Sequence, residues 1–149
     1  MVQTEIPENP ARILGTHVAM KGLQLGSVLG LVGVYPVLHY IRKIPKRQAW
    51  VTSMFVTPFV GMVVTSTMLY MKHNAGQLDE TGVEDRAYRI SQGTQPKVDR
   101  VTQLAMAMGL AFGALGGMGV AGSIAYSTTA IPIGIFVYKG GDMLKTITK

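Results

Sequence analysis

The sequence has 149 residues, which is enough for one domain, and only 15 % of them are charged. It contains no cysteine, which excludes disulfides, thiolate metal sites and cysteine nucleophiles. The formal net charge of +6 suits nucleic acid or anionic lipid, and the long uncharged stretches described below favour lipid.

The chain begins with a polar segment at residues 1–15 and continues with an apolar segment at residues 16–41. The polar segment has no apolar core and is not rich in arginine, so we expect neither a secretory signal nor a transit peptide there. The apolar segment is the first predicted membrane span. Lys21 lies near its start, where the side chain can reach the headgroups, and Pro36 is expected to kink it.

A basic loop separates the first span from a second one at residues 50–71. Trp50 and Tyr70 flank the second span, as aromatic residues do at membrane interfaces, and we expect Pro58 and Gly61 to interrupt its helix. Four cations fall within six loop residues, which predicts contact with lipid headgroups. These are Arg42, Lys43, Lys46 and Arg47.

Residues 72–100 form a polar loop. The pattern from Thr81 to Glu84 fits a capping box, which predicts a short surface helix over Gly82–Ile90, and Pro96 is placed to begin the next helix. Alternating charges favour either a solvated surface or a docking surface for a partner subunit. The docking candidates are Asp85, Arg86, Arg89, Asp99 and Arg100, with Asp85 and Arg89 spaced to pair on a helix.

The stretch from Val101 to Tyr138 has no charged residue and corresponds to about 57 Å of helix, against a hydrocarbon core about 30 Å thick. It therefore predicts two further spans, at about 101–121 and 124–138, rather than one long tilted helix. Its most polar part, Ser123–Thr129, is the expected turn. Residues 16–139 are thus predicted to be an all-α domain of four transmembrane helices, followed by a charged tail at 140–149.

An even number of spans places both termini on one side of the membrane with the 72–100 loop. Because the 42–47 loop is densely basic, we orient it to the inside and the termini to the outside. His17, His39 and His73 lie near the span ends without metal-ligand spacing, and are expected to be interfacial residues.

Two stripes of small residues recur at four-residue spacing, which places each stripe on one helix face. Small residues let membrane helices approach closely, so both stripes predict glycine-zipper packing, most simply of the first span against the third. The general glycine richness of membrane helices is the alternative explanation. The stripes are Gly22, Gly26 and Gly30, and Ala105, Gly109, Gly113, Gly117 and Ala121.

No pattern in the sequence indicates catalysis. The segment Gly117–Gly122 matches the dinucleotide-binding pattern G-x-G-x-x-G, but it lies inside an apolar run instead of following a strand. Neither a nucleophile–base pair nor a metal cluster is present in the sequence pattern. We therefore expect a non-enzyme without catalytic, cofactor-binding or metal-binding residues, with a bound phospholipid such as cardiolipin as the one small-molecule candidate.

Four short spans, glycine stripes and a polar loop before the third span resemble the mitochondrial inner-membrane translocase (Tim) family of four-helix proteins. The resemblance covers residues 16–138, and the lead-in "DRVTQLAMAMG" before the third span is similar in style. The stretch after the third span lacks the arginine-containing signature of the translocase members. The residues that carry the resemblance are Gly22, Gly26, Gly30, Gly109, Gly113 and Gly117.

That departure favours the branch of the family that contains an accessory subunit of respiratory complex I. The resemblance implies a non-catalytic, multi-pass structural subunit of NADH:ubiquinone oxidoreductase in the mitochondrial inner membrane. Its partners would be other membrane subunits of the complex and lipids, with no nucleic acid. The alternatives are a preprotein translocase subunit, an accessory subunit of another respiratory or ATP-synthase complex, and a small transporter.

Overall fold

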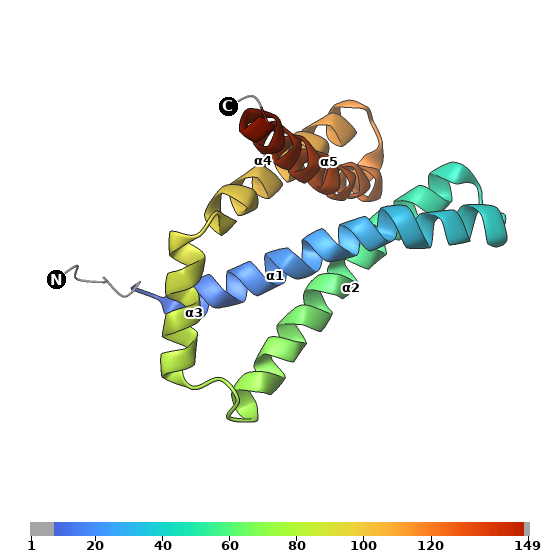
Figure 1. Cartoon of the computed structure of the whole chain (residues 1–149). Coiled ribbons are helices and arrows are strands. Elements are labelled where there is room, and N and C mark those ends of the chain that lie inside the picture. Colours follow the sequence, from blue (N-terminus) through green and yellow to red (C-terminus); the bar gives the residue numbers. More distant parts are fainter. Residues whose placement is uncertain (1–7, 148–149) are drawn as a thin grey trace.

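The computed structural model describes residues 8–147, and the side chains of residues 8–141, as an all-helical structure (Figure 1). The all-α prediction is confirmed. Residues 1–7 of the polar N-terminal segment, and most side chains of the charged tail, lie outside the described residues. The elements are α1 (Pro10–Leu29), the π-helical turns η1 (Gly30–Val34) and η2 (Val37–Ile41), α2 (Lys46–Asn74), α3 (Glu80–Gln92), α4 (Gln95–Leu115) and α5 (Gly119–Ile147).

Three described helical segments are long and apolar enough to cross a membrane: Pro10–Ile41, Lys46–Asn74 and Gly119–Gly141. The helix α4 is not one of them. Its uncharged part begins at Val101, so only about 22 Å of apolar helix precedes its end at Leu115, which is less than the thickness of a hydrocarbon core. The protein is therefore a candidate membrane protein with three segments of spanning length.

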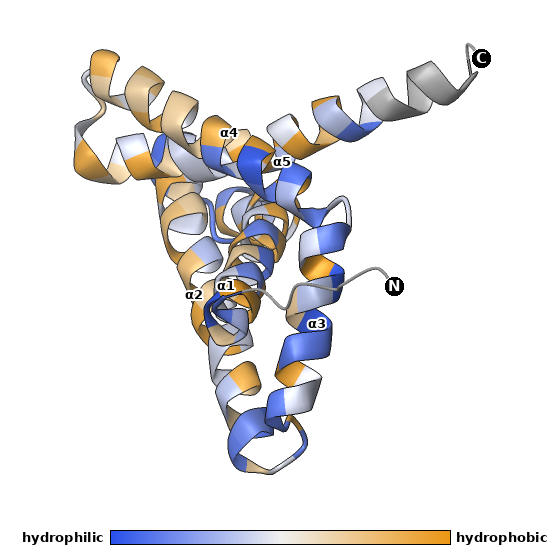
Figure 2. Cartoon of the chain, turned by 90° about the vertical axis from the view of Figure 1, so that its left-hand side faces the viewer, coloured by the Kyte–Doolittle hydropathy of each residue, from blue (hydrophilic) through white to orange (hydrophobic). Residues whose placement is uncertain are grey.

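The helices form two hairpins. In the first, α1 and its π-helical turns pack along α2, and in the second, α4 packs along α5. The second hairpin crosses the first, and α5 contacts both α1 and α2. The helix α3 connects the two hairpins (Figures 1 and 2). Figure 2 shows that hydrophilic residues gather on α3 and the adjoining start of α4.

The predicted pairing of the first span with the third is wrong. The glycines of α1 face α2, and those of α4 face α5. Each helix packs on the neighbour to which a short connection joins it. Contact between α1 and α4 is confined to a small area, which is described below.

The turn between the third and fourth apolar segments lies at Gly116–Met118, not at Ser123–Thr129. Gly117 and Gly119 have φ of 66° and 69°, a left-handed conformation that glycine adopts without steric cost. The Ser–Thr cluster is helical instead, because its hydroxyls donate to helix carbonyls; Thr129, for example, donates to the carbonyl of Ala125 at 2.7 Å.

The turn also divides the longer small-residue stripe. Ala105, Gly109 and Gly113 are buried on α4, but Gly117 lies in the turn and Ala121 is exposed on α5. The five residues therefore do not form one continuous helix face. The break comes from the left-handed glycines, whose conformation the spacing pattern does not reveal.

Several helix ends and prolines differ from expectation. The helix α2 continues through Pro58 and Gly61 without interruption, and Pro58 is buried against α1. Asp79, not Thr81, caps α3, with its Oδ1 accepting a hydrogen bond from the backbone of Gly82 at 2.8 Å. Pro96 lies in the first turn of α4, close to the predicted helix start.

Candidate functional site between the helical hairpins

In the first hairpin, the backbones of α1 and α2 approach each other closely at glycine residues. A Cβ atom added to Gly26 would lie 2.5 Å from the carbonyl oxygen of Thr57 and 2.7 Å from the Cα of Pro58. A Cβ at Gly22 would overlap the carbonyl of Gly61, and one at Gly61 would overlap the carbonyl of Gly22. These positions leave no room for a side chain larger than hydrogen.

The second hairpin has a similar contact. A Cβ at Gly109 would lie 2.5 Å from the carbonyl oxygen of Tyr126, and one at Gly113 would lie 2.5 Å from the Cα of Ser123. Close approach of backbones increases the number of van der Waals contacts, which drive helix association in lipid. In both hairpins, glycines therefore lie where the two helix backbones approach each other closely.

A line of polar side chains joins α1 to α4. Gln24 is buried, and its Nε2 donates to the hydroxyl of Thr102 at 2.8 Å, while its Oε1 accepts from Lys21 Nζ at 3.0 Å. The Thr102 hydroxyl in turn donates to the carbonyl oxygen of Val98 at 3.0 Å. The amide of Gln24 thus connects the one cation within the first apolar segment to the second hairpin.

The same line continues one helical turn further at His17 and Asp99. His17 Nδ1 lies 3.2 Å from Asp99 Oδ2, and the two side chains are 15 % and 18 % exposed. Together with Lys21, Gln24 and Thr102 they form what we call the polar seam. Polar pairs in a mostly apolar setting fix one helix register, because any other register would leave them without partners.

Two acceptor atoms at the Asp99 end of the seam have no hydrogen-bond partner among the described residues. They are Asp99 Oδ1 and Gln95 Oε1, and both atoms are buried. Gln95 and Asp99 are one turn apart on α4, so they share a face of that helix. Buried acceptors of this kind normally have a donor.

Hydroxyl side chains of α5 contact both α2 of the first hairpin and α4 of its own hairpin. Thr128 Oγ1 lies 2.6 Å from the carbonyl oxygen of Met54 on α2, and Ser127 Oγ donates to the carbonyl of Met106 on α4 at 2.9 Å. Trp50 of α2 packs edge-on against Tyr126 of α5, with ring centroids 4.8 Å apart. The stretch that the sequence pattern indicated as a turn therefore packs against α4 within the second hairpin and against α2 of the first hairpin.

We expect Thr128→Val to weaken the contact between hairpins by about 0.5–1.5 kcal/mol, since valine keeps the shape but cannot hydrogen-bond to Met54. Thr129→Val is the matched control, because the Thr129 hydroxyl donates only within α5. Unfolding in detergent, followed by the fluorescence of the single tryptophan, compares the two variants. Equal stabilities would contradict the role of Thr128.

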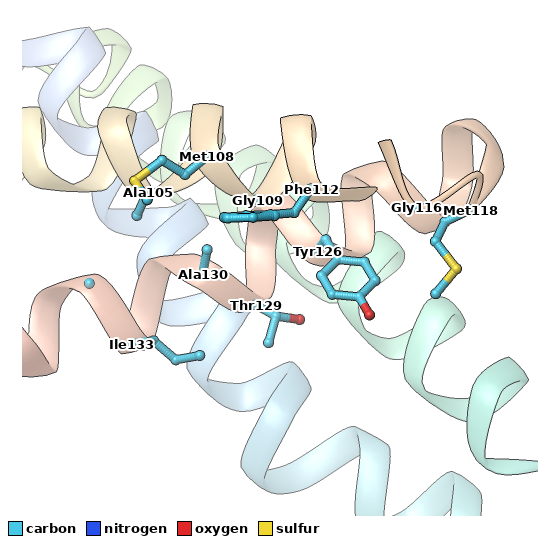
Figure 3. Close-up of a pocket in the computed structure, with 11 residues that line it drawn as sticks. Ala105, Met108, Gly109, Phe112, Gly116, Met118, Tyr126, Thr129, Ala130 and Ile133 are labelled. Carbon is cyan, nitrogen blue, oxygen red and sulfur yellow. The ribbon is translucent and has the colours of Figure 1, made fainter. Parts of the chain in front are cut away.

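An apolar cavity of about 550 Å³ lies along the second hairpin (Figure 3). Figure 3 shows that Met108 and Phe112 of α4, and Tyr126 and Ile133 of α5, border it. Its lining is Ala105, Met108, Gly109, Phe112, Gly116, Met118, Tyr126, Thr129, Ala130, Ile133 and Gly134. With no titratable group other than the Tyr126 phenol, this lining suits hydrocarbon and offers no acid–base pair.

The predicted docking residues do not all lie on an open surface. Asp85 and Arg89 form the predicted pair on α3, with 3.0 Å between Arg89 Nη2 and Asp85 Oδ2, and both are exposed. Arg86 and Arg100 are also exposed, but Asp99 belongs to the polar seam and faces α1. The docking role of Asp99 stays a prediction, and in this structure its carboxylate contacts His17.

The predicted lipid-contacting cations, Arg42, Lys43, Lys46 and Arg47, are all exposed around the connection between α1 and α2. His39 and His73 each lie within 3.1 Å of a backbone carbonyl, of Ile44 and Leu78 respectively. Among residues 8–141, no group of three or more His, Cys, Asp or Glu side chains lies close enough together to hold a metal ion.

Sequence reasoning missed the polar seam, although a signal for it exists. Residues 17, 21 and 24 are spaced to share one face of a helix, and residues 95, 99 and 102 repeat that spacing. Matching polar faces in two separate helices indicate a contact between them. The pattern does not show which helices contact each other. The crossing of the two hairpins determines that α1 meets α4 at these residues.

Residues 3–130 match a family described as "Protein of unknown function (DUF1757)". The chain belongs to this family. The family region contains the polar seam and the glycine contacts of both hairpins, and it ends within α5, just beyond Thr128. No curated protein and no solved structure matches the chain. The resemblance to the Tim family rests on the sequence pattern alone.

Proposed function

We propose that the protein is a non-catalytic structural accessory subunit of respiratory complex I in the mitochondrial inner membrane. The observation that carries this proposal is how the buried polar groups of the described residues are used. Gln24, Thr102, Ser127 and Thr128 all hydrogen-bond across or along helix contacts. Polar side chains that hydrogen-bond between helices are typical of a structural subunit. A transporter instead needs polar groups along the path that its substrate takes through the membrane.

The exposed apolar faces support a partner-bound state in lipid. Within the most apolar 18-residue stretch of α2, only 11 % of the residues are buried inside the chain. Val56, Val60 and Val63 are each about half exposed and lie on one side of that helix. Lipid chains or the helices of neighbouring subunits can cover such a face, and we propose that both do.

For the membrane arrangement, we propose four embedded segments, with α4 entering the membrane as the partner of α5. Glycine-zipper packing within each hairpin supports this arrangement, because a short apolar helix gains van der Waals contacts by pairing closely. The 42–47 loop then faces the inside, with the two termini and α3 on the other side.

The proposal is tested by solubilising mitochondrial membranes in mild detergent and resolving complexes on a native gel. We expect this chain to migrate with the band that oxidises NADH, and its depletion to lower the amount of that assembled band. Migration with preprotein translocase components or with ATP synthase would instead favour those complexes, and would overturn the assignment to complex I.

A further inference from the structure

The connection between α1 and α2 concentrates positive charge that the chain does not neutralise. Arg42, Lys43, Lys46 and Arg47 are exposed, and the sequence has no acidic residue between Glu8 and Asp79. The α4–α5 turn beside this connection comes from a second acid-free stretch, between Asp99 and Asp142. Among residues 8–141, the charge at this end of the molecule therefore lacks an acidic partner from either hairpin.

The placement of two of these cations is unfavourable for the chain alone. Lys46 and Arg47 occupy the first turn of α2, where the helix dipole disfavours positive charge and where no acidic residue is present. Pro45, which precedes the helix, provides no side-chain cap. An external anion would relieve both effects, since it would neutralise the cations and interact favourably with the dipole.

The backbone of the loop is held in place. Lys43 adopts a left-handed φ of 55°, which is uncommon for a residue with a side chain. The backbone amides of Arg42 and Ile44 donate to the carbonyls of Val37 and Leu38, each at 3.0 Å. The loop therefore presents its cations from a fixed turn, at the end of two helices that are long enough to cross a membrane.

An apolar groove begins at these cations. A cavity of about 410 Å³ lies between the first turns of α2 and the α4–α5 turn, and Arg47, Val51, Met118 and Ala121 are among its lining residues. Met118 also lines the larger cavity of the second hairpin, where Figure 3 shows it near Tyr126. A charged rim continued by an apolar groove matches the two parts of a phospholipid.

We propose that the basic loop and the groove beside it bind one anionic phospholipid. The phosphate contacts the cations of residues 42–47, and an acyl chain lies along Val51, Met118 and Ala121. A lipid fits better than an acidic protein segment, because the connection is short and lies where two spanning helices meet the membrane surface. The site does not depend on the identity of the complex to which the subunit belongs.

The single tryptophan, Trp50, directly precedes the groove residue Val51 in α2 and gives a test. The full chain is placed in nanodiscs of phosphatidylcholine that contain a small fraction of a lipid with brominated acyl chains, which quench tryptophan on contact. We expect brominated phosphatidylglycerol to quench at about a tenth of the mole fraction that brominated phosphatidylcholine needs.

The double variant K46Q/R47Q should remove this preference. The matched control is K72Q/R86Q, which removes two exposed cations outside the basic loop and should retain it. Circular dichroism verifies that both variants keep their helices. Equal quenching by the two lipids, or an unchanged preference in K46Q/R47Q, would overturn the proposal. So would inorganic phosphate that abolishes the preference, since the site would then recognise phosphate without a lipid chain.

Discussion

Replacement of Gly26 by leucine should destabilise the first hairpin by about 1–3 kcal/mol, the range for overpacked sites. The Cβ alone would lie 2.5 Å from the Thr57 carbonyl oxygen, and the contacting atoms belong to the α2 backbone, which cannot rotate away. The helices must therefore separate along their whole contact. Unfolding in detergent, followed by Trp50 fluorescence, measures the loss.

Gly33→Leu is the matched control for this experiment. Gly33 lies two turns further along the same helical segment, and nothing would approach its Cβ within 4 Å. We expect this variant to be as stable as the parent or slightly more stable, because leucine favours helix over glycine. If Gly26→Leu unfolds at the same denaturant concentration as Gly33→Leu, close packing at Gly26 does not stabilise the hairpin.

The second large effect is expected from Gln24→Leu in the polar seam. Leucine removes the 2.8 Å hydrogen bond to Thr102 and takes away the acceptor of the Lys21 ammonium group. Interhelical hydrogen bonds in membranes contribute about 0.5–2 kcal/mol each, and direct contact between α1 and α4 is limited to this area. We therefore expect the two helices to move apart while each hairpin stays intact.

This separation can be measured because the chain has no cysteine of its own. Spin labels on cysteines introduced at Leu25 and Leu104, which are 56 % and 65 % exposed, report the distance between α1 and α4. Gln24→Leu should lengthen or broaden that distance distribution. Gln103→Leu, the same change at an exposed position beside Thr102, should not. A narrow, unshifted distribution in Gln24→Leu would show that the seam is dispensable.

The sequence was informative about helices and less so about their partners. Uncharged apolar runs predict spans, because burying a charge in hydrocarbon is costly, and three segments of spanning length occur at the predicted positions. The turn near Gly117 was missed because the adjacent Ser–Thr cluster is more polar. Those hydroxyls can satisfy themselves on helix carbonyls, so their polarity does not require a turn.

The candidate site was predicted only in part. Small-residue spacing indicated the faces of Gly22 and Gly26 that meet another helix, but gave no information about which helix they meet. The polar seam depends on a long-range arrangement, since Gln24 and Thr102 are 78 residues apart in the chain. Helix periodicity is local, so it identifies a polar face without identifying the face that it contacts.

The position of α5 after the first hairpin in chain order has a consequence for the order of synthesis. Domains fold from the N-terminal side as the chain emerges, so the first hairpin is complete before the helix that packs on it has been made. Until then the carbonyl of Met54 lacks the hydroxyl of Thr128, with which it later pairs. The two hairpins can therefore join only after α5 has been synthesised.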